Sequence, residues 1–493
     1  MAVTLALVEG GSLFSAVSAM VLIAGQSHIL DWRDVLWLMA QAGALSLCCF
    51  VAFYYSDLYD LRIARSFGEF ASRLFQSLGV AFLLLAAFYG LFPNARIAQG
   101  PFVSSLLIVL GLLLPLRAIS YSVMRSRPFV DRVLILGTGA LARQLIAEIE
   151  ARPDCRFAIV GVVSDAQSPG TTTMSSHSIR GTLEHLDQLV SEVRPDRIVV
   201  ALAERRGRLP VRQLLEARMQ GIIVEDGVET YERLARKIPI ESLTPSHLIF
   251  SKDFKKSRLQ LASGRALSLI VAAAGLIVCA PLLALIAIAI KLDSNGPAFF
   301  VQERVGKHAK TFKLIKFCTM HPANYTASQW VRDNNHRVTR VGKWLRKFRF
   351  DELPQFINIL RGDLNLVGPR PHPVSNFDLF LKEIPYYALR SVVRPGVTGW
   401  AQIRYGYAND LSEETEKMRY DLYFIKHLSL WLDLRILMDT VKTVLFARGS
   451  TSTFEALATQ SVRDGSTGAR SQGRRGDGEG HRRTHADAHP ASS

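Results

Sequence analysis

Residues 130–150 read VDRVLILGTGALARQLIAEIE, an apolar strand that runs through a glycine turn into a helical pattern. This order matches the dinucleotide-binding fingerprint, with Gly137 and Gly139 in the turn and Ala142 in the place of the third glycine. Two further apolar strands are expected, at 157–165 and 196–202, with helical stretches between them. The pattern predicts a Rossmann-like parallel α/β domain over residues 130–231.

The glycine turn itself has two interpretations. A nucleotide or nucleotide-sugar could bind at the start of the helix after Gly139. Alternatively, the turn is structural and binds nothing. A ribose contact would need an acidic residue about 20 positions further on, and the first suitable one, Asp165, comes later. The short unit and the late aspartate favour the structural interpretation, although both stay open.

Residues 1–125, before this domain, hold four apolar segments, each close to the ~20 residues that a membrane-spanning helix needs. They lie at 3–25, 35–54, 74–92 and 102–124. Basic residues gather between the second and third segments and from late in the fourth segment onward: Arg62, Arg65, Arg73, Arg117, Arg125 and Arg127. The bias of basic residues toward the cytoplasm predicts a four-helix transmembrane bundle with both ends cytoplasmic.

The composition agrees with a membrane protein that has a basic solvent-facing part. The 493 residues are 49% apolar, yet the formal net charge is +16, and most of it lies between residues 252 and 361. Such a stretch could face nucleic acid, anionic lipid or phosphorylated small molecules. The five cysteines are scattered without metal-ligand spacing, which fits a reducing compartment. No basic residue precedes the first apolar segment, so a cleaved signal peptide is not expected.

A polar linker with two prolines is expected at 232–263, and a further apolar segment follows it. Residues 266–290 carry no charge, but Pro281 lies inside and basic residues flank both ends. Proline bends a helix, and the flanks give neither end an obvious outer side. We therefore predict a re-entrant membrane helix over 265–291, with a simple fifth crossing as the alternative.

This helix opens a compact, mainly α domain predicted over 264–448. Late in it, residues 417–446 read as helices with broad apolar faces, which suit either a membrane interface or an ordinary core. The tail at 449–493 is rich in Gly, Ser, Arg and Asp and is expected to be disordered.

The chemistry centres on residues 345–371, LRKFRFDELPQFINILRGDLNLVGPRP, where Asp351 and Glu352 are adjacent in a basic setting. One interpretation is a solvated helix start. The other is catalysis. Neighbours on a helix point about 100° apart, so the two carboxylates would divide the work. One would attack phosphorus as a nucleophile and the other would hold Mg²⁺.

Six sequence blocks give this domain a family resemblance. They are GPAFFVQERVG, KLIKF-TM, DELPQ-INIL-GDL, LVGPRP, RPGVTGWAQ and YDLYFIK. In this order over residues 264–448 they resemble the bacterial sugar transferase domain of the monotopic polyprenol-phosphate phosphoglycosyl transferases. The whole chain except the tail resembles the long form of that family. Its fold is a membrane α/β architecture: a four-helix bundle, a Rossmann-like domain, and a re-entrant helix leading into a compact, mainly α catalytic domain.

The resemblance implies a ping-pong reaction in two steps. Asp351 attacks the sugar-bearing phosphorus of a UDP-sugar, UMP leaves, and polyprenyl phosphate then takes the phosphosugar from the carboxylate. Glu352 would ligate Mg²⁺, and Asp421 would be an active-site carboxylate that supports the pair. The product would start a repeat unit of an exopolysaccharide, O-antigen or capsule. The implied location is the inner membrane, with the catalytic domain facing the cytoplasm.

The same motifs suggest further site residues. Arg370 in GPRP is a phosphate-binding candidate by resemblance, and the charge of Arg304, Lys316 and Arg394 leads us to add them. Pro281 matches the proline that breaks the membrane hairpin. Cys318 stands where relatives usually carry Arg or Lys, so one cation is missing. UDP-glucose or UDP-galactose are the expected donors. The sequence leaves open which is used, and whether the Rossmann-like domain binds a regulator, forms a homodimer or acts as a spacer.

Two other function classes fit the sequence less well. A membrane-tethered nucleotide-sugar dehydratase or epimerase would need a catalytic Tyr-x-x-x-Lys helix and a longer cofactor fold, and the Rossmann-like unit has neither. A nucleic-acid-binding protein would need a recognisable module, but the basic stretch interleaves its charges with Gly/Pro turns. We therefore expect lipid and phosphorylated substrates as partners, and no nucleic acid.

Overall fold

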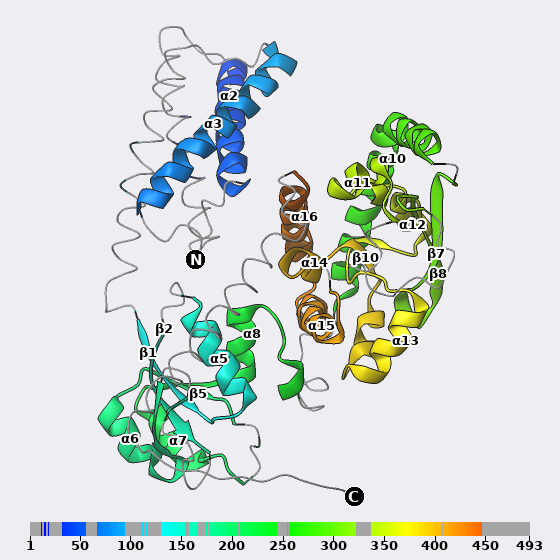
Figure 1. Cartoon of the computed structure of the whole chain (residues 1–493). Helices are drawn as coiled ribbons and strands as arrows, with labels where there is room; N and C mark the ends of the chain where they lie inside the picture. Colours follow the sequence, from blue (N-terminus) through cyan, green and yellow to red (C-terminus); the bar gives the residue numbers. More distant parts are fainter. Residues whose placement is uncertain are drawn as a thin grey trace, which may run out of the picture. The chain divides into compact units, whose positions relative to one another are not determined.

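The structure is a computed structural model of the whole chain (Figure 1). Apart from a few isolated positions, it describes residues 32–55, 67–93, 130–152, 157–165, 173–174, 177–202, 207–243, 256–294, 296–321, 337–406 and 408–445. The contacts divide the chain into two compact units. Unit 1 comprises residues 1–263, 375–393 and 411–432, and unit 2 comprises 264–374, 394–410 and 433–493. The predicted catalytic domain is therefore shared between the two units.

Two long apolar helices correspond to the second and third predicted membrane segments. They are α2 (Trp32–Tyr55) and α3 (Phe67–Leu91), and they lie side by side (Figure 1). Leu45, Phe53 and Leu74 are buried in these helices, whereas Phe75 and Phe82 are exposed. Most of the first and fourth predicted segments lies outside the described residues.

A six-stranded sheet forms the centre of the predicted Rossmann-like domain, in the order β3-β4-β2-β1-β5-β6. All its neighbouring strands are parallel except β3 and β4. The strands are β1 (Asp131–Leu136), β2 (Phe157–Ser164), β3 (Thr173–Met174), β4 (His177–Thr182), β5 (Arg197–Val200) and β6 (Ile223–Asp226). This sheet confirms the predicted α/β arrangement.

Helices cover both faces of this sheet, as Figure 1 shows. On one face α5 (Ala140–Glu150) and α8 (Gly227–Ala235) pack through a core that includes Leu145 and Tyr231. On the other face lie η3 (Leu183–His185), α6 (Leu186–Val193) and α7 (Val211–Met219). Apolar residues on both sides of each central strand explain why β1 reads as a nearly continuous apolar run.

The glycine turn after β1 has a structural reason for its first glycine. Gly137 has φ +115°, and a Cβ there would lie 2.7 Å from the carbonyl oxygen of Ala201 at the end of β5. Only glycine tolerates both the conformation and the contact. Next to it, the hydroxyl of Thr138 donates to Asp165 at 2.7 Å. These contacts support the structural interpretation of the turn.

Unit 1 also contains segments from late in the sequence. They are most of α13 (Val374–Glu383), η9 (Tyr387–Val392) and α15 (Leu411–Lys426). The 3₁₀ turn η4 (Ile240–Ser242) belongs to the same unit. The first residues of the expected polar linker belong to α8. Among them Glu232 is buried, and its carboxylate lies 2.8 Å from Lys426 Nζ and 2.6 Å from His427 Nε2. Ile238 N donates to Arg419 O at 3.1 Å. Ion pairs and backbone bonds therefore join the end of the Rossmann-like domain to α15.

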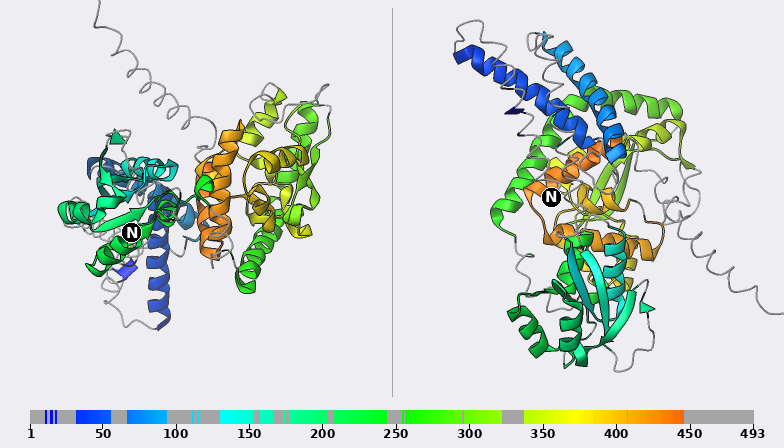
Figure 2. Two further views of the ribbon diagram at one scale, coloured as in Figure 1. Left: turned by 90° about the horizontal axis from the view of Figure 1, so that it is seen from below. Right: turned by 90° about the vertical axis from the view of Figure 1, so that its left-hand side faces the viewer.

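Unit 2 is built on α10 (Arg258–Asp293), the helix that holds Pro281. Figures 1 and 2 show its two halves running in different directions, as expected of a helix with an internal proline. Among the described residues α10 alone is long and apolar enough to span a membrane, by length and composition only. Apolar side chains such as Ile277, Val278 and Leu285 are exposed along it.

Short elements pack against α10 to complete unit 2. They are β7 (Phe299–Val305), η6 (Lys307–Ala309), β8 (Thr311–Phe317), α11 (Arg340–Lys347), η8 (Phe350–Glu352), α12 (Gln355–Arg361), β9 (Asn365–Val367), β10 (Gly396–Thr398), α14 (Trp400–Arg404) and most of α16 (Leu430–Leu445). β7 and β8 form an antiparallel hairpin, and β9 pairs with β10 in parallel. Arg265 of α10 donates to the carbonyl of Ile359 in α12 and to that of Leu364 just beyond it, which ties α10 to the end of α12.

Candidate active site

The Asp-Glu pair lies in a short 3₁₀ turn, η8, between α11 and α12. Arg349 adopts a left-handed conformation, φ 58° and ψ 21°, and so reverses the chain direction after α11. The exposed fractions of Asp351 and Glu352 are only 9% and 7%. Burial of this extent excludes the interpretation of the pair as a solvated helix start. Two buried carboxylates on adjacent residues call for nearby positive charge.

Glu352 has that positive charge close by. Arg370 Nη2 lies 2.8 Å from Glu352 Oε1, and Arg349 Nη1 lies 3.5 Å from the same oxygen. Burial alone would raise the pKa of Glu352, but the two guanidinium groups outweigh it and hold that pKa below its usual value. Glu352 is therefore ionised and fixed in orientation.

Asp351 differs from its neighbour in having no such partner. Within the described part of the chain, its carboxylate makes no hydrogen bond or ion pair. Burial, followed by repulsion from Glu352, raises the pKa of Asp351, while Lys316, Arg370 and Arg346 oppose that rise through their positive charge. A buried carboxylate that no donor occupies keeps its lone pairs available for attack on an electrophile.

Cations from the β7–β8 hairpin surround the pair. Lys316 Nζ lies 5.0 Å from the centre of the Phe300 ring, and it forms no hydrogen bond or ion pair among the described residues. Burial, together with repulsion from Arg304, lowers the pKa of Lys316 to about 8. Burial and Arg370 lower the pKa of Arg304 to about 9. Both groups would gain from a nearby anion.

Two arginines near the Asp-Glu pair have buried nitrogen atoms without a hydrogen-bond partner among the described residues. Arg304 donates to Pro371 O at 2.9 Å and to Gln302 Oε1 at 2.6 Å, but its buried Nε has no hydrogen-bond partner among the described residues. Arg346 Nη1 is in the same situation. Buried donors without partners carry a free-energy penalty, so an anionic oxygen would be bound favourably.

Glycines in the motifs around Arg370 explain how this side chain is held. A Cβ on Gly368 would lie 2.6 Å from Arg394 O, and one on Gly396 would lie 2.1 Å from Gly368 N. A Cβ on Gly399 would lie 2.2 Å from Gly368 O. The backbones of LVGPRP and RPGVTGWAQ therefore approach too closely for any side chain. This contact fixes the turn that directs Arg370 toward Glu352.

The other predicted site residues lie in different surroundings. Arg394 donates through Nε to Gly362 O at 3.2 Å, at the end of α12. Cys318, in the place of the usual cation, packs against the apolar cluster of Ile286, Phe317 and Leu345. A role of Arg394 in binding phosphate remains a prediction.

Asp421 belongs to unit 1, where it lies in a buried charged cluster on α15 and η9. Its Oδ2 lies 2.8 Å from Arg390 Nη2, and Lys417 Nζ lies 2.9 Å from Glu414 Oε2 beside it. Burial raises the pKa of Asp421 despite the neighbouring Arg390. Arg390 also bonds the hydroxyl of Tyr387. The support of the Asp-Glu pair by Asp421 likewise remains a prediction.

Sequence reasoning missed two residues. Asn358 bonds to the strand that carries Lys316, and Arg390 pairs with Asp421 in unit 1. The Asn358 amide donates to Lys313 O at 2.8 Å and to Asp363 Oδ2 at 3.0 Å, and its oxygen accepts from Ile315 N at 3.0 Å. It thereby joins α12 to the strand that carries Lys316. The motif INIL contained Asn358, but only its zero exposure shows that its amide bonds within the core.

The residues present fit a magnesium ion. Glu352 Oε2 and the Asp351 carboxylate supply oxygen ligands that no hydrogen bond or ion pair occupies among the described residues. Mg²⁺ is often held by one or two carboxylates and by substrate phosphates. In the described part of the chain no group of three or more His, Cys, Asp or Glu gathers to form a protein-only metal cage. The ion would then bind together with its phosphate substrate.

Two family models match the chain. Residues 259–447 match the bacterial sugar transferase family, and residues 54–217 match a family described as a CoA-binding domain. A relative from Klebsiella pneumoniae, UDP-glucose:undecaprenyl-phosphate glucose-1-phosphate transferase, is 33% identical over 63% of this chain and 67% of its own length. The chain belongs to the bacterial sugar transferase family. This confirms the resemblance drawn from the six sequence blocks.

Two further relatives have similar names. The UDP-N-acetylgalactosamine-undecaprenyl-phosphate N-acetylgalactosaminephosphotransferase of Aeromonas hydrophila is 44% identical over 38% of this chain and 44% of its own length. The undecaprenyl-phosphate glucose phosphotransferase of Komagataeibacter xylinus is 31% identical over 66% of this chain and 61% of its own length. The chain thus spans between 44% and 67% of the length of these three relatives. The bacterial sugar transferase match includes the Asp-Glu pair, the β7–β8 hairpin and Arg370.

Proposed function

We propose that the chain transfers a hexose 1-phosphate from a UDP-sugar to polyprenyl phosphate and releases UMP. The observation that carries this proposal is Asp351, a buried carboxylate without a hydrogen bond, next to cations that lack an anionic partner. Relatives named for undecaprenyl-phosphate sugar phosphotransfer support the substrate class.

The first step forms a bond between Asp351 and the sugar-bearing phosphorus. The carboxylate oxygen attacks, the bond from phosphorus to the bridging oxygen of UMP breaks, and UMP leaves with the electron pair. Lys316, Arg304 and Arg370 stabilise the negative charge that builds up on the phosphate oxygens. A magnesium ion held by Glu352 would neutralise further phosphate charge when it is bound.

The second step releases the enzyme. A phosphate oxygen of polyprenyl phosphate attacks the same phosphorus, the bond to Asp351 breaks, and polyprenyl-diphosphate-sugar is formed. Asp351 is then ionised again, as the first step needs. The positive setting of Lys316, Arg370 and Arg346 favours this charged form.

The location in the cell belongs to this proposal as well. Four transmembrane helices would anchor the chain in the inner membrane, and α10 would enter and leave from the cytoplasmic side because Pro281 bends it. The exposed apolar side chains of α10 support contact with lipid. The expected donors are UDP-glucose and UDP-galactose, and the product would start an exopolysaccharide, O-antigen or capsule repeat unit.

The test of the nucleophile is the Asp351→Asn variant in nanodiscs. With Mg²⁺, polyprenyl phosphate and a panel of UDP-sugars, the wild type should release UMP, whereas the variant should lose at least about 10³-fold in turnover, because an amide is a poor nucleophile. Wild type given donor alone should show a phosphosugar adduct on Asp351 by mass spectrometry.

The matched control is Glu303→Gln, which makes the same change on an exposed residue of β7. It should leave UMP release unchanged. Appearance of UDP in place of UMP would contradict the proposed reaction. Retained turnover in Asp351→Asn would contradict the covalent intermediate.

A further inference from the structure

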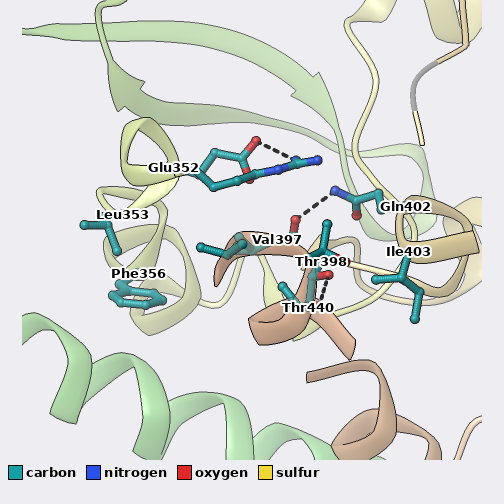
Figure 3. A pocket seen from close by; sticks show the side chains of 11 residues that line it. Glu352, Leu353, Phe356, Val397, Thr398, Gln402, Ile403 and Thr440 are labelled. Carbon is teal, nitrogen blue, oxygen red and sulfur yellow. Dashed lines mark hydrogen bonds and ion pairs between the residues drawn. The ribbon is translucent and has the colours of Figure 1, made fainter. Parts of the chain in front are cut away.

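A pocket of about 110 Å³ opens beside Glu352 in unit 2 (Figure 3). Its walls come from five elements: η8, α12, β10, α14 and α16. The lining residues are Arg349, Glu352, Leu353, Phe356, Val397, Thr398, Gln402, Ile403, Thr440, Thr443 and Val444. The charged residues among them are only Arg349 and Glu352, so the pocket has an apolar interior next to a charged margin.

The threonines of the pocket direct their polar atoms into the protein. Thr440 donates to Ile436 O at 2.7 Å, so the contact of 2.7 Å between the hydroxyls of Thr398 and Thr440 must use the hydrogen of Thr398. Thr443 donates to Asp439 O at 3.0 Å. Because their hydroxyls bond within the protein, these threonines contribute chiefly methyl groups to the pocket. The pocket wall is therefore more apolar than its residue types suggest.

The side-chain amide of Gln402 also forms a hydrogen bond within the protein. Its Nε2 donates to Val397 O at 3.1 Å, whereas its buried Oε1 has no hydrogen-bond partner among the described residues. A nucleobase would need donors for its carbonyl oxygens, but the hydroxyls of the threonines and one of the two Gln402 N–H groups donate within the protein. The single open acceptor therefore does not make this a nucleobase site, and an apolar ligand fits the walls better.

The pocket also lies next to α10, the helix with exposed apolar side chains. The Phe356 ring forms part of the wall and rests on Gly275 of α10, where an added Cβ would lie 2.6 Å from the ring. Only one aromatic ring therefore separates this wall from the helix with exposed apolar side chains. A hydrocarbon chain that comes from the lipid side and ends in a phosphate meets an apolar wall first and charged groups last.

We propose that this pocket binds the phosphate-proximal isoprene units of the polyprenyl phosphate acceptor. The acceptor phosphate then lies at Arg349 and Glu352, next to Asp351. This assignment rests on the proposed function for the acceptor's identity, but prenyl binding can be measured without turnover. It gives Thr398, Ile403, Thr440 and Thr443 a role in recognising the lipid.

The test fills the pocket and measures binding of two probes to full-length protein in nanodiscs with Mg²⁺. Thr443→Trp places an indole in the pocket, and its matched control, Val441→Trp, lies on the same helix but is exposed and outside the lining. We expect Thr443→Trp to raise the Kd of farnesyl phosphate at least ten-fold and to leave the Kd of UMP unchanged. Val441→Trp should change neither value.

Other outcomes would overturn the assignment. If Thr443→Trp leaves farnesyl phosphate binding unchanged, the prenyl chain binds elsewhere. If the Kd of UMP rises instead, the pocket holds the nucleoside of the donor. Ile403→Trp repeats the test from α14 in case Thr443→Trp does not fold. A wild type that binds farnesyl phosphate but releases no UMP from any donor contradicts the proposed reaction and not the pocket.

Discussion

At the scale of single residues, the site places a carboxylate with an arginine partner next to a carboxylate without a hydrogen bond or ion pair among the described residues. Glu352 is paired with Arg370, whereas Asp351 makes no hydrogen bond or ion pair among the described residues. The two adjacent carboxylates therefore differ in their contacts, because the Arg370 guanidinium reaches only Glu352. The sequence indicated such a division, since neighbours on a turn point in different directions. It could not show which carboxylate the arginine reaches.

Lys316 leads to a pH prediction. Its pKa of about 8 means that it is mostly charged at pH 7 and mostly neutral at pH 9. A charged hydrogen bond contributes about 1.5–3 kcal/mol, so its loss should raise the KM for the donor about ten-fold at high pH. Lys316→Met should show the high KM already at pH 7. The measurement is the KM of the accepted UDP-sugar between pH 7 and 9.

The control for this prediction is Lys316→Arg, because a guanidinium keeps its proton better than an ammonium in the same place. Its KM should rise less than that of the wild type between pH 7 and 9. A wild-type KM that stays constant over this range would show that Lys316 does not contact the donor phosphates.

At the scale of elements, the sequence predicted regular segments better than long-range contacts. The apolar periodicity of β1 and α5 predicted the α/β domain, and the apolar run with Pro281 predicted α10. The segment at 232–263 read as a polar linker, because the partners of its charges lie about 180 residues away on α15. For the same reason the bridge from Asn358 to β8 was not foreseen.

One prediction concerns α16, which carries a buried carboxylate. Burial raises the pKa of Asp433 from 3.8 to about 7, and its Oδ1 has no hydrogen-bond partner among the described residues. Between these pH values the folded state binds the proton more tightly than the unfolded state, so stability falls as the pH rises. The penalty above pH 7 is at most roughly 4 kcal/mol, from 1.36 kcal/mol per pKa unit.

Asp433→Asn removes this ionisation and should therefore have a higher melting temperature than the wild type at pH 8. At pH 4.5 the difference should be much smaller, because this pH is close to the ordinary pKa of 3.8 and little of the penalty has developed. Thermal unfolding in detergent at the two pH values measures the difference. A variant that is less stable than the wild type at pH 8 would mean that the charged carboxylate has a favourable partner.

At the scale of the whole molecule, the Rossmann-like domain is joined to part of the sugar transferase match. Within unit 1, Glu232 of α8 accepts from Lys426 and His427, and Lys237 pairs with Glu416 of α15. The same helix carries Asp421. These contacts hold α15 against the Rossmann-like domain, and no bound nucleotide takes part in them.

The last prediction tests this interface. Glu232 is buried, and its neighbours Lys426 and His427 outweigh the effect of burial, so that its pKa lies below the usual value. The stabilisation is therefore present at neutral pH and lost as the pH falls through that lowered pKa. Removing one partner of a fully buried ion pair costs about 3–5 kcal/mol. The cost here should be smaller, because Lys426 and His427 are only partly buried. Glu232→Ala should therefore lower the melting temperature, whereas Glu229→Ala, an exposed glutamate of the same helix, should not.

A double-mutant cycle assigns this loss to the interface. If Glu232 acts through Lys426, the effects of Glu232→Ala and Lys426→Ala should not add, and the coupling energy should be about 0.5–3 kcal/mol. If Asp421 supports the Asp-Glu pair as predicted, UMP release by the single variants should also fall, because a displaced α15 displaces Asp421. Additive effects on stability, with UMP release unchanged, would mean that the Rossmann-like domain and α15 fold independently and that this interface does not position the helix.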